Sequence, residues 1–157
     1  INDFDRISLR NEIIYRINNL RKNRFSSDTS AVWVNYESLI RLAYKMSDTN
    51  LAYINSGEGS FKIDSINTFT YEGIGKLLKE VHELNGYIDF WKKEIDFWNR
   101  RNENMLENIR IIIKENPGSK ILLMCGFAHK NYLLNGLLEY AEENEINIKV
   151  YGDYFKK

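Results

Sequence analysis

The stretch that most constrains the fold is residues 120–130, with the sequence KILLMCGFAHK. Its apolar run, residues 121–125, has no helical period and lies between Pro117-Gly118 and Gly126. A short apolar run between turn signals is typical of a buried strand. A helical pattern begins directly after Gly126, so the stretch predicts a strand that turns into a helix. Open α/β sheets place their ligands at such turns.

A second strand is predicted near the end of the chain. Ile146, Ile148 and Val150 alternate with polar residues, which is the pattern of a half-buried strand. Residues 131–143, which lie between the two runs, have apolar residues at helical spacing. Strand, helix and strand over about thirty residues predict a right-handed, parallel βαβ unit.

The rest of the chain is predicted to be mostly helical. Apolar residues recur at helical spacing over residues 6–21, 31–46, 74–81 and 87–115. Residues 51–55 and 61–64 are short and partly alternating, and they flank the loop SGEGS. This pattern predicts a small hairpin, with a loop that forms no ladder as the alternative. The expected fold is therefore α/β, with a mostly helical N-terminal part and a C-terminal βαβ unit on a small parallel or mixed sheet.

The length of 157 residues predicts a single domain, residues 1–157. Two strands do not make a stable parallel sheet, because such sheets have more strands and are covered on both faces. We therefore expect the chain to be part of a larger α/β domain that lacks an N-terminal βα segment. The first residue, Ile1, is not Met, which agrees with that expectation.

Charge and cysteine content restrict the partners. The 22 basic and 22 acidic residues give a net charge of zero, so nucleic acid is not an expected partner. No apolar run is long enough to predict a transmembrane segment. The single cysteine excludes an internal disulfide and a zinc-type cysteine cluster. The compartment stays open between a soluble cytoplasmic protein and one exported after signal removal, and so does the oligomeric state.

The long predicted helix has one polar break in its apolar stripe, at Asn102, with Arg101 beside it. A buried amide needs a partner, because leaving it unpaired costs about 1–3 kcal/mol. One interpretation is that Asn102 fixes helix register, as a lone Asn does in a coiled-coil seam. The other is that Arg101 and Asn102 face a polar site cut into the core.

His129 is the strongest candidate for chemistry. It follows Gly126 on the predicted turn, where Gly allows a close backbone approach, and an imidazole can act as acid, base or metal ligand near neutral pH. Common catalytic motifs, including GxSxG, the P-loop, GxGxxG and HExxH, are absent from the sequence. Cys125 is expected to be a small core hydrophobe, and pairing with His129 as a nucleophile is the less favoured alternative.

The same residues resemble a known family. Residues 97–105 (FWNRRNENM), Asn108-Ile109, the Pro-Gly turn and residues 121–130 with Tyr132-Leu133 are similar to the C-terminal half of the TraB/Tiki-type superfamily. That superfamily includes erythromycin-esterase-like and haem-uptake ChaN-like proteins. The resemblance covers about residues 90–152 and is nearest to a group of uncharacterised bacterial proteins with an RNxxM…GxxHK pattern.

The resemblance implies a hydrolase that acts on a small molecule or a peptide. It assigns His129 and Arg101 as catalytic residues, and Asn102 and Gly126 to substrate binding. A divalent metal is an option that the resemblance leaves open, with no metal ligand assigned. The first GxxH motif of the superfamily has no counterpart here, because His82, the other histidine, has no Gly at the motif position.

The alternative is a non-catalytic α/β module that serves binding or structure. In that interpretation aromatic side chains line a groove or a partner surface. The candidates are Trp91, Phe97, Trp98, Tyr132 and Tyr154.

Overall fold

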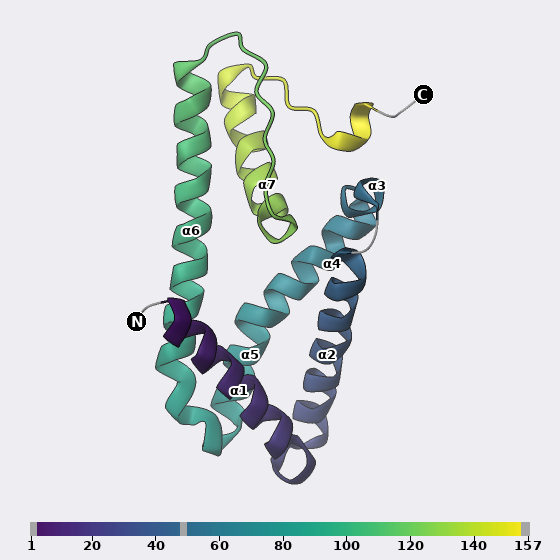
Figure 1. Ribbon diagram of the computed structural model, residues 1–157, viewed down its shortest axis with the longest axis vertical. Coiled ribbons are helices and arrows are strands. Elements are labelled where there is room, and N and C mark those ends of the chain that lie inside the picture. Colours follow the sequence, from purple (N-terminus) through teal and green to yellow (C-terminus); the bar gives the residue numbers. More distant parts are fainter. Residues whose placement is uncertain (1–2, 48–49, 155–157) are drawn as a thin grey trace.

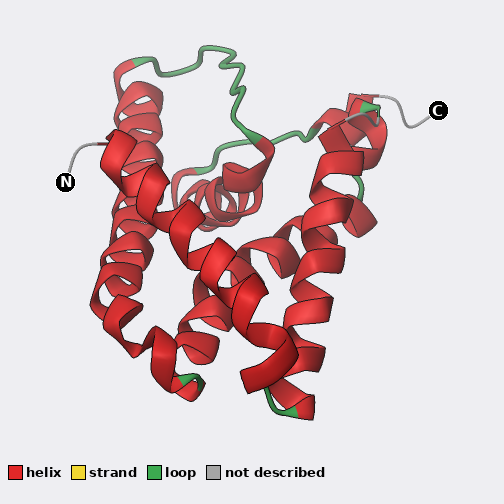
Figure 2. Ribbon diagram, turned by 60° about the horizontal axis from the view of Figure 1, so that its bottom comes forward, coloured by secondary structure: helices red, strands yellow, loops and turns green. Residues whose placement is uncertain are grey.

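The computed structural model describes residues 3–47 and 50–154, and over these residues it contains helices and connections but no strand (Figures 1 and 2). The predicted α/β fold is therefore wrong, and this part of the chain is all-α. In order, the elements are α1 (Asp3–Arg24), α2 (Ser27–Ser47), α3 (Leu51–Ile54), α4 (Gly57–Thr68), a π-helical turn (Phe69–Gly73), α5 (Ile74–Glu80), a 3₁₀ helix (His82–Tyr87), α6 (Ile88–Glu115), α7 (Phe127–Asn144) and a 3₁₀ helix (Tyr151–Tyr154).

The helices predicted from apolar periodicity are confirmed. The predictions for residues 6–21, 31–46, 87–115 and 131–143 correspond to α1, α2, α6 and α7, and residues 74–81 correspond to α5. The side chain of Ser26 accepts a hydrogen bond from the backbone N–H of Thr29, which makes Ser26 the N-cap of α2. Thr70 is not an N-cap, because α4, the π-helical turn and α5 follow one another without a break.

The helices are arranged as a base with two arms (Figure 1). The base contains α1, α5 and the first half of α6, and one arm is formed by the second half of α6 with α7. The other arm is formed by α2 with α3 and α4. Helix α6 is therefore shared between the base and one arm.

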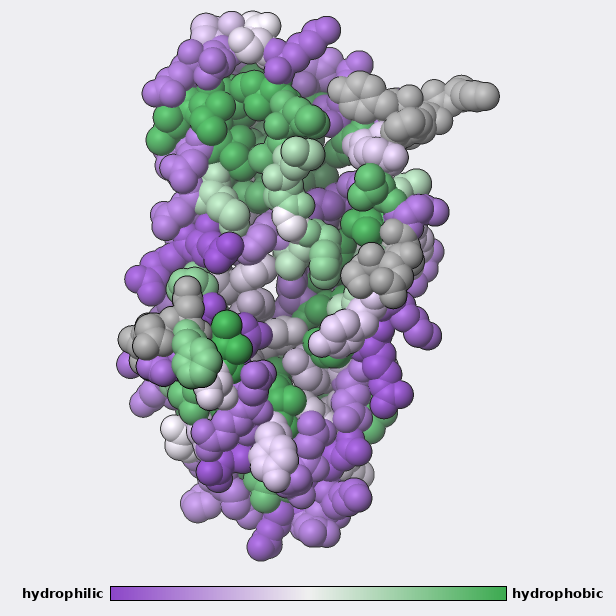
Figure 3. Space-filling model, viewed as in Figure 1, coloured by the Kyte–Doolittle hydropathy of each residue, from purple (hydrophilic) through white to green (hydrophobic). Residues whose placement is uncertain are grey.

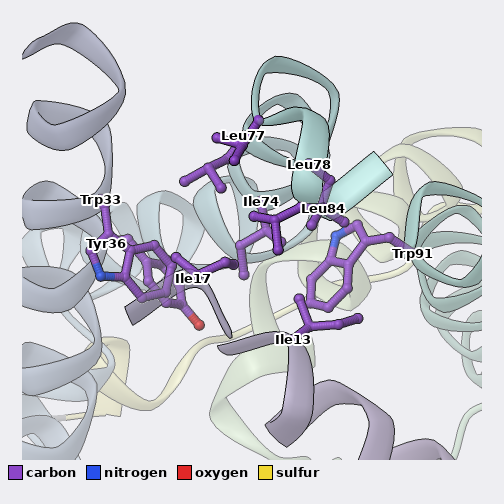
Figure 4. Packing of buried hydrophobic residues seen from close by; sticks show 10 residues of the cluster. Ile13, Ile17, Trp33, Tyr36, Ile74, Leu77, Leu78, Leu84 and Trp91 are labelled. Atoms are coloured by element: carbon purple, nitrogen blue, oxygen red, sulfur yellow. The ribbon is translucent and has the colours of Figure 1, made fainter. Parts of the chain in front are cut away.

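Among the residues that the structure describes, three separate apolar clusters hold these parts together. The largest lies in the base, where Trp33, Ile74, Leu84 and Trp91 are among the buried side chains (Figure 4). A second cluster packs the end of α2 against α4. The third packs the second half of α6 against α7, where Gly136 lets the side chain of Leu106 approach the α7 backbone closely.

The predicted hairpin is wrong, since residues 51–55 and 61–64 lie in or next to α3 and α4. Two N-caps explain the outcome. The side chain of Asn50 accepts a hydrogen bond from the N–H of Tyr53, and the side chain of Ser56 accepts one from Gly59. Gly59 has no side chain, which allows the carbonyl groups at the end of α3 to approach the first turn of α4.

The two predicted strands of the βαβ unit are also absent. Residues 121–125 and 146–150 are connections without secondary structure. A strand needs a neighbour with which to exchange backbone hydrogen bonds, and neither segment has such a neighbour among the described residues. Cys125 is consequently exposed, so its predicted place in the core is wrong.

Helices α6 and α7 are side by side and run in the same direction (Figure 1). The 18 residues of α7 span about 27 Å at 1.5 Å per residue. Residues 116–126 must return over that length before α7 begins, so this connection is drawn out along the outside of the arm.

Candidate functional site

The candidate site lies where the first turn of α7 meets the middle of α6. The Nδ1 atom of His129 is 2.7 Å from Oδ1 of Asn102. These two residues are far apart in the sequence, and the packing of α7 on α6 brings them together. Asn102 is almost completely buried, so this hydrogen bond places its amide inside the interface between the two helices.

The local backbone explains the position of His129. Gly126 is the N-cap of α7 with φ −62° and ψ 140°, and its carbonyl accepts a hydrogen bond of 3.0 Å from the N–H of His129. A Cβ added at Gly126 would make an ordinary contact of 3.8 Å with Cδ2 of His129. Space alone therefore does not require Gly at this position, and its substrate-binding role stays a prediction.

His129 also belongs to an aromatic stack that the sequence analysis missed. Its ring lies on that of Trp98 with centroids 4.5 Å apart, and Trp98 lies on Tyr71 with centroids 4.8 Å apart. Tyr71 comes from the π-helical turn between α4 and α5, and such turns are frequent at functional sites. No sequence pattern marks a π-helical turn here, which is why the contribution of Tyr71 was not predicted.

The environment favours the neutral form of the imidazole. Burial lowers the pKa of His129 below its ordinary value, and the positive charge of Arg101 lowers this pKa further. In a neutral imidazole one ring nitrogen carries the proton and the other accepts. The Asn102 oxygen can only accept, so Nδ1 donates to it and the lone pair is on Nε2.

Asn102 does more than fix helix register, because its oxygen holds the imidazole. Its Nδ2 atom is buried and has no hydrogen-bond partner among the described residues. A buried amide with one half unpaired costs free energy, so this atom is unusual within a helix interface. The contact with His129 favours the second interpretation for Asn102, whereas Arg101 is exposed and does not face the core.

Arg101 is next to the site on the exposed face of α6. Its charge reaches His129, and in the described part of the chain it makes no ion pair or hydrogen bond. Glu94, two turns earlier on α6, is buried and does not pair with Arg101. Instead, its carboxylate oxygens lie 3.1 Å from Arg6 and 3.5 Å from Arg10, both on α1.

The residues that follow His129 bind the other arm. Nζ of Lys130 donates to the Ile54 carbonyl at 3.1 Å and to the Ser60 hydroxyl at 2.9 Å, and the Asn131 amide donates to the Ser60 carbonyl at 2.7 Å. Asn67 of α4 in turn donates to the Ala128 carbonyl at 2.8 Å. The first turn of α7 is therefore a polar joint between the two arms.

Other chemistry receives less support. The described residues contain no group of three or more His, Cys, Asp or Glu side chains that could hold a metal ion. Burial raises the pKa of the Cys125 thiol, even though the residue as a whole is exposed. A raised pKa reduces the thiolate fraction, and this argues against Cys125 as a nucleophile.

A groove of about 570 Å³ lies between α6 and α7 and is lined by residues that include Glu103, Arg110 and Tyr132. The predicted catalytic and substrate-binding residues do not line it, whereas Tyr132, one of the aromatic residues predicted to line a groove, does.

The aromatic residues predicted to line one groove do not form a single surface. Trp91 is buried in the base, whereas Tyr132 is exposed on α7 and Trp98 is half-buried in the stack. The side chain of Tyr154 lies outside the described part of the structure. Trp91 is therefore a core residue, and the prediction that it lines a groove is wrong.

Comparisons with protein-family models, with curated proteins and with solved structures found no match for this chain. The resemblance to the TraB/Tiki-type superfamily stays a prediction that rests on the residues quoted for it. Within the described ranges, none of the helices combines the length and the apolar character needed to cross a membrane.

Proposed function

We propose that the chain carries a hydrolase site in which His129 acts as the general base. The observation that carries the proposal is the 2.7 Å contact between Nδ1 of His129 and Oδ1 of Asn102. This contact fixes the tautomer whose Nε2 can accept a proton from a water molecule. The lowered pKa favours the unprotonated form of that nitrogen.

Arg101 has the complementary role in this proposal. Attack of water on an ester or amide carbonyl develops negative charge on the carbonyl oxygen. A guanidinium beside the base stabilises that charge or binds a carboxylate of the substrate. The proposal agrees with the substrate class implied by the TraB/Tiki-type resemblance, a small molecule or a peptide.

The experiment measures hydrolysis of 4-nitrophenyl esters and of a mixed peptide library by the purified chain. His129→Ala should lower the rate by about 10²- to 10⁴-fold, the usual contribution of a general base. His82→Gln is the matched control, because His82 is exposed on the 3₁₀ helix away from α7. Arg101→Ala should lower the rate. Arg100→Ala, which removes the neighbouring exposed charge on α6, should leave the rate unchanged.

Folding of each variant is checked by circular dichroism. A folded His129→Ala chain that hydrolyses substrate as fast as the wild type would refute the proposal. So would a long-range ¹H–¹⁵N spectrum that places the proton of His129 on Nε2.

A second candidate is a binding module without catalysis. The observation that favours it is the exposed apolar run at residues 121–124, since large exposed apolar patches mark interaction sites. Absence of hydrolysis in every substrate assay, together with a partner that covers this run, would favour the second candidate over the first.

A further inference from the structure

The first turn of α7 presents backbone donors that have no partner. Helix α7 is 18 residues long, and its N-cap, Gly126, has no side chain with which to cap the helix. Among the described residues, the N–H groups of Phe127 and Ala128 donate to no other group, and that of His129 donates to the Gly126 carbonyl. Free N–H groups at the start of a helix carry partial positive charge and bind anions well.

A buried side chain adds a further donor at this turn. Asn102 is 1% exposed, and its Nδ2 atom has no hydrogen-bond partner in the described part of the chain. The oxygen of the same amide is 2.7 Å from Nδ1 of His129, the third residue of α7. Because the oxygen and nitrogen of an amide are only about 2.2 Å apart, the unpaired Nδ2 lies at the turn that carries the free N–H groups. A buried donor without a partner costs free energy, which a bound acceptor would recover.

The charges around the turn also favour an anion. Arg101 is exposed on α6, makes no ion pair or hydrogen bond in the described part of the chain, and its positive charge acts on the His129 ring. Lys130, next to His129, adds a second positive charge. The first turn of α7 contains no acidic residue, and the carboxylate that acts on Lys130 is that of Asp64, on α4. A ligand with negative charge therefore meets mainly positive charge here.

The N-terminal end of α7 is accessible. Gly126 is exposed, and a Cβ added to it would meet, apart from its chain neighbours, only Cδ2 of His129 within 4 Å. Figure 3 shows hydrophobic surface gathered at the upper end of the molecule, whereas the surface is mixed and hollowed between the two arms, where Figure 1 places the start of α7. A small polar ligand therefore has room to reach this turn.

We propose that this turn is a binding site for the oxyanion of a small molecule, either a carboxylate or a phosphate. The N–H groups of Phe127 and Ala128 and the Nδ2 of Asn102 donate to its oxygen atoms. The Arg101 guanidinium balances its charge. That the bound molecule is the substrate rests on the proposed function, and the hydrolysed ester or amide then also carries an acidic group. Binding itself needs no hydrolysis.

A ¹H–¹⁵N titration of the purified chain with sodium phosphate, and separately with sodium acetate, tests the site at constant ionic strength. The amide signals of Phe127 and Ala128 should shift saturably, with a dissociation constant on the order of a millimolar. Sodium chloride should not cause such a shift. The first turn of α4 is the internal control, because Ser56 caps it and Glu58 already supplies negative charge, so the amides of Gly57 and Glu58 should not respond.

Substitution of Phe127 isolates one backbone donor. Proline has no N–H and fits the first position of a helix, so Phe127→Pro removes this donor without breaking α7. Phe127→Ala loses the same side chain and keeps the N–H. Phe127→Pro should therefore bind phosphate about tenfold more weakly than Phe127→Ala, the usual effect of losing a hydrogen bond to a charged group.

Two α6 variants test the side-chain donors. Asn102→Asp keeps an oxygen that accepts from His129 and replaces Nδ2 by a second carboxylate oxygen, so anion binding should be lost. Arg101→Gln should weaken binding severalfold, whereas Arg100→Gln, which removes the neighbouring exposed charge, should leave binding unchanged. Circular dichroism shows whether each variant is folded, and the comparison at the exposed Phe127 stays decisive if Asn102→Asp does not fold.

The proposal is overturned if the Phe127 and Ala128 signals show no saturable shift at about 100 mM of either anion, or if Phe127→Pro binds as tightly as Phe127→Ala. Tighter binding of phosphate than of acetate would support a phosphate-bearing ligand, and the reverse would support a carboxylic acid. Hydrolysis of neutral 4-nitrophenyl esters by a chain that binds neither anion would overturn the anion site and leave the hydrolase intact. Anion binding by a chain that hydrolyses nothing would support the anion site and refute the hydrolase.

Discussion

His129 and Asn102 show how one side-chain pair links two helices and prepares a ring for chemistry. The Asn102 amide is buried in α6 and reaches only a single described partner, Nδ1 of His129. Trp98 covers one face of the imidazole. Two features disfavour a second proton on the ring: its partial burial and the positive charge of the neighbouring Arg101.

This environment predicts that acid destabilises the fold. The pKa of His129 in the folded state lies below the value of about 6.5 for an exposed histidine, so the unfolded chain binds the proton more readily. The stability that this residue contributes is complete above pH 6.5. It is lost as the pH falls from about 6.5 through the folded-state pKa.

The measurement is the free energy of unfolding in urea at pH 7.5, 6.5 and 5.5. The wild type should lose stability over this range, and His129→Gln should show a smaller loss because Gln does not titrate. His82→Gln, at the exposed histidine, should keep the wild-type slope. Equal slopes for the wild type and His129→Gln would show that other groups control the acid sensitivity.

At the scale of the elements, apolar periodicity predicted the long helices correctly, because each buries one stripe against a neighbour. It failed for residues 121–125, since the same apolar run suits a buried strand or an extended connection, and only a partner strand decides between them. It failed for residues 51–64 because two caps, Asn50 and Ser56, select helix over hairpin. Local propensity is overridden where a single side-chain hydrogen bond satisfies the first N–H groups of a helix.

Gly59 tests the corrected assignment of this region. A Cβ at position 59 would collide with the Tyr53 carbonyl oxygen and would lie 3.0 Å from that of Ile54. Both are backbone atoms at the end of α3, which cannot move aside as a side chain does. Gly59→Ala should therefore lower the free energy of unfolding by about 1–3 kcal/mol, the usual cost of overpacking.

Gly57 provides the matched control in the same turn. An added Cβ there meets no atom within 4 Å, and Ala is the better helix former, so Gly57→Ala should be neutral or stabilise by up to about 1 kcal/mol. Chemical denaturation of both variants checks the pair. If the two variants had the same stability, the close packing of α3 on α4 would be wrong.

At the scale of the whole molecule, three apolar clusters are joined in two different ways. The base connects to one arm through α6, and to the other through the continuous run of α4, the π-helical turn and α5. The arms meet each other mainly through hydrogen bonds at the first turn of α7. The sequence indicated His129 in this turn, but no pattern links Lys130 and Asn131 to Ser60, because contacts between distant segments depend on the tertiary arrangement.

The polar joint should control how firmly the arms are held together. Burial lowers the pKa of Lys130, so its ammonium group gains little from this position beyond its two hydrogen bonds. Asn131 is buried and donates to the Ser60 carbonyl. Asn131→Leu removes that donor, and it should lower the free energy of unfolding by about 1–3 kcal/mol.

Hydrogen exchange locates the effect. In Asn131→Leu, amides in the first turns of α4 and α7 should exchange faster, while amides that surround the Trp33 and Trp91 cluster of the base keep their protection, because that cluster does not depend on the joint. Asn135→Leu, exposed one turn further along α7, should change stability by no more than about 0.5 kcal/mol. Uniform loss of protection over the base and both arms would mean that the molecule unfolds as one unit, and that the joint is no weaker than the apolar clusters.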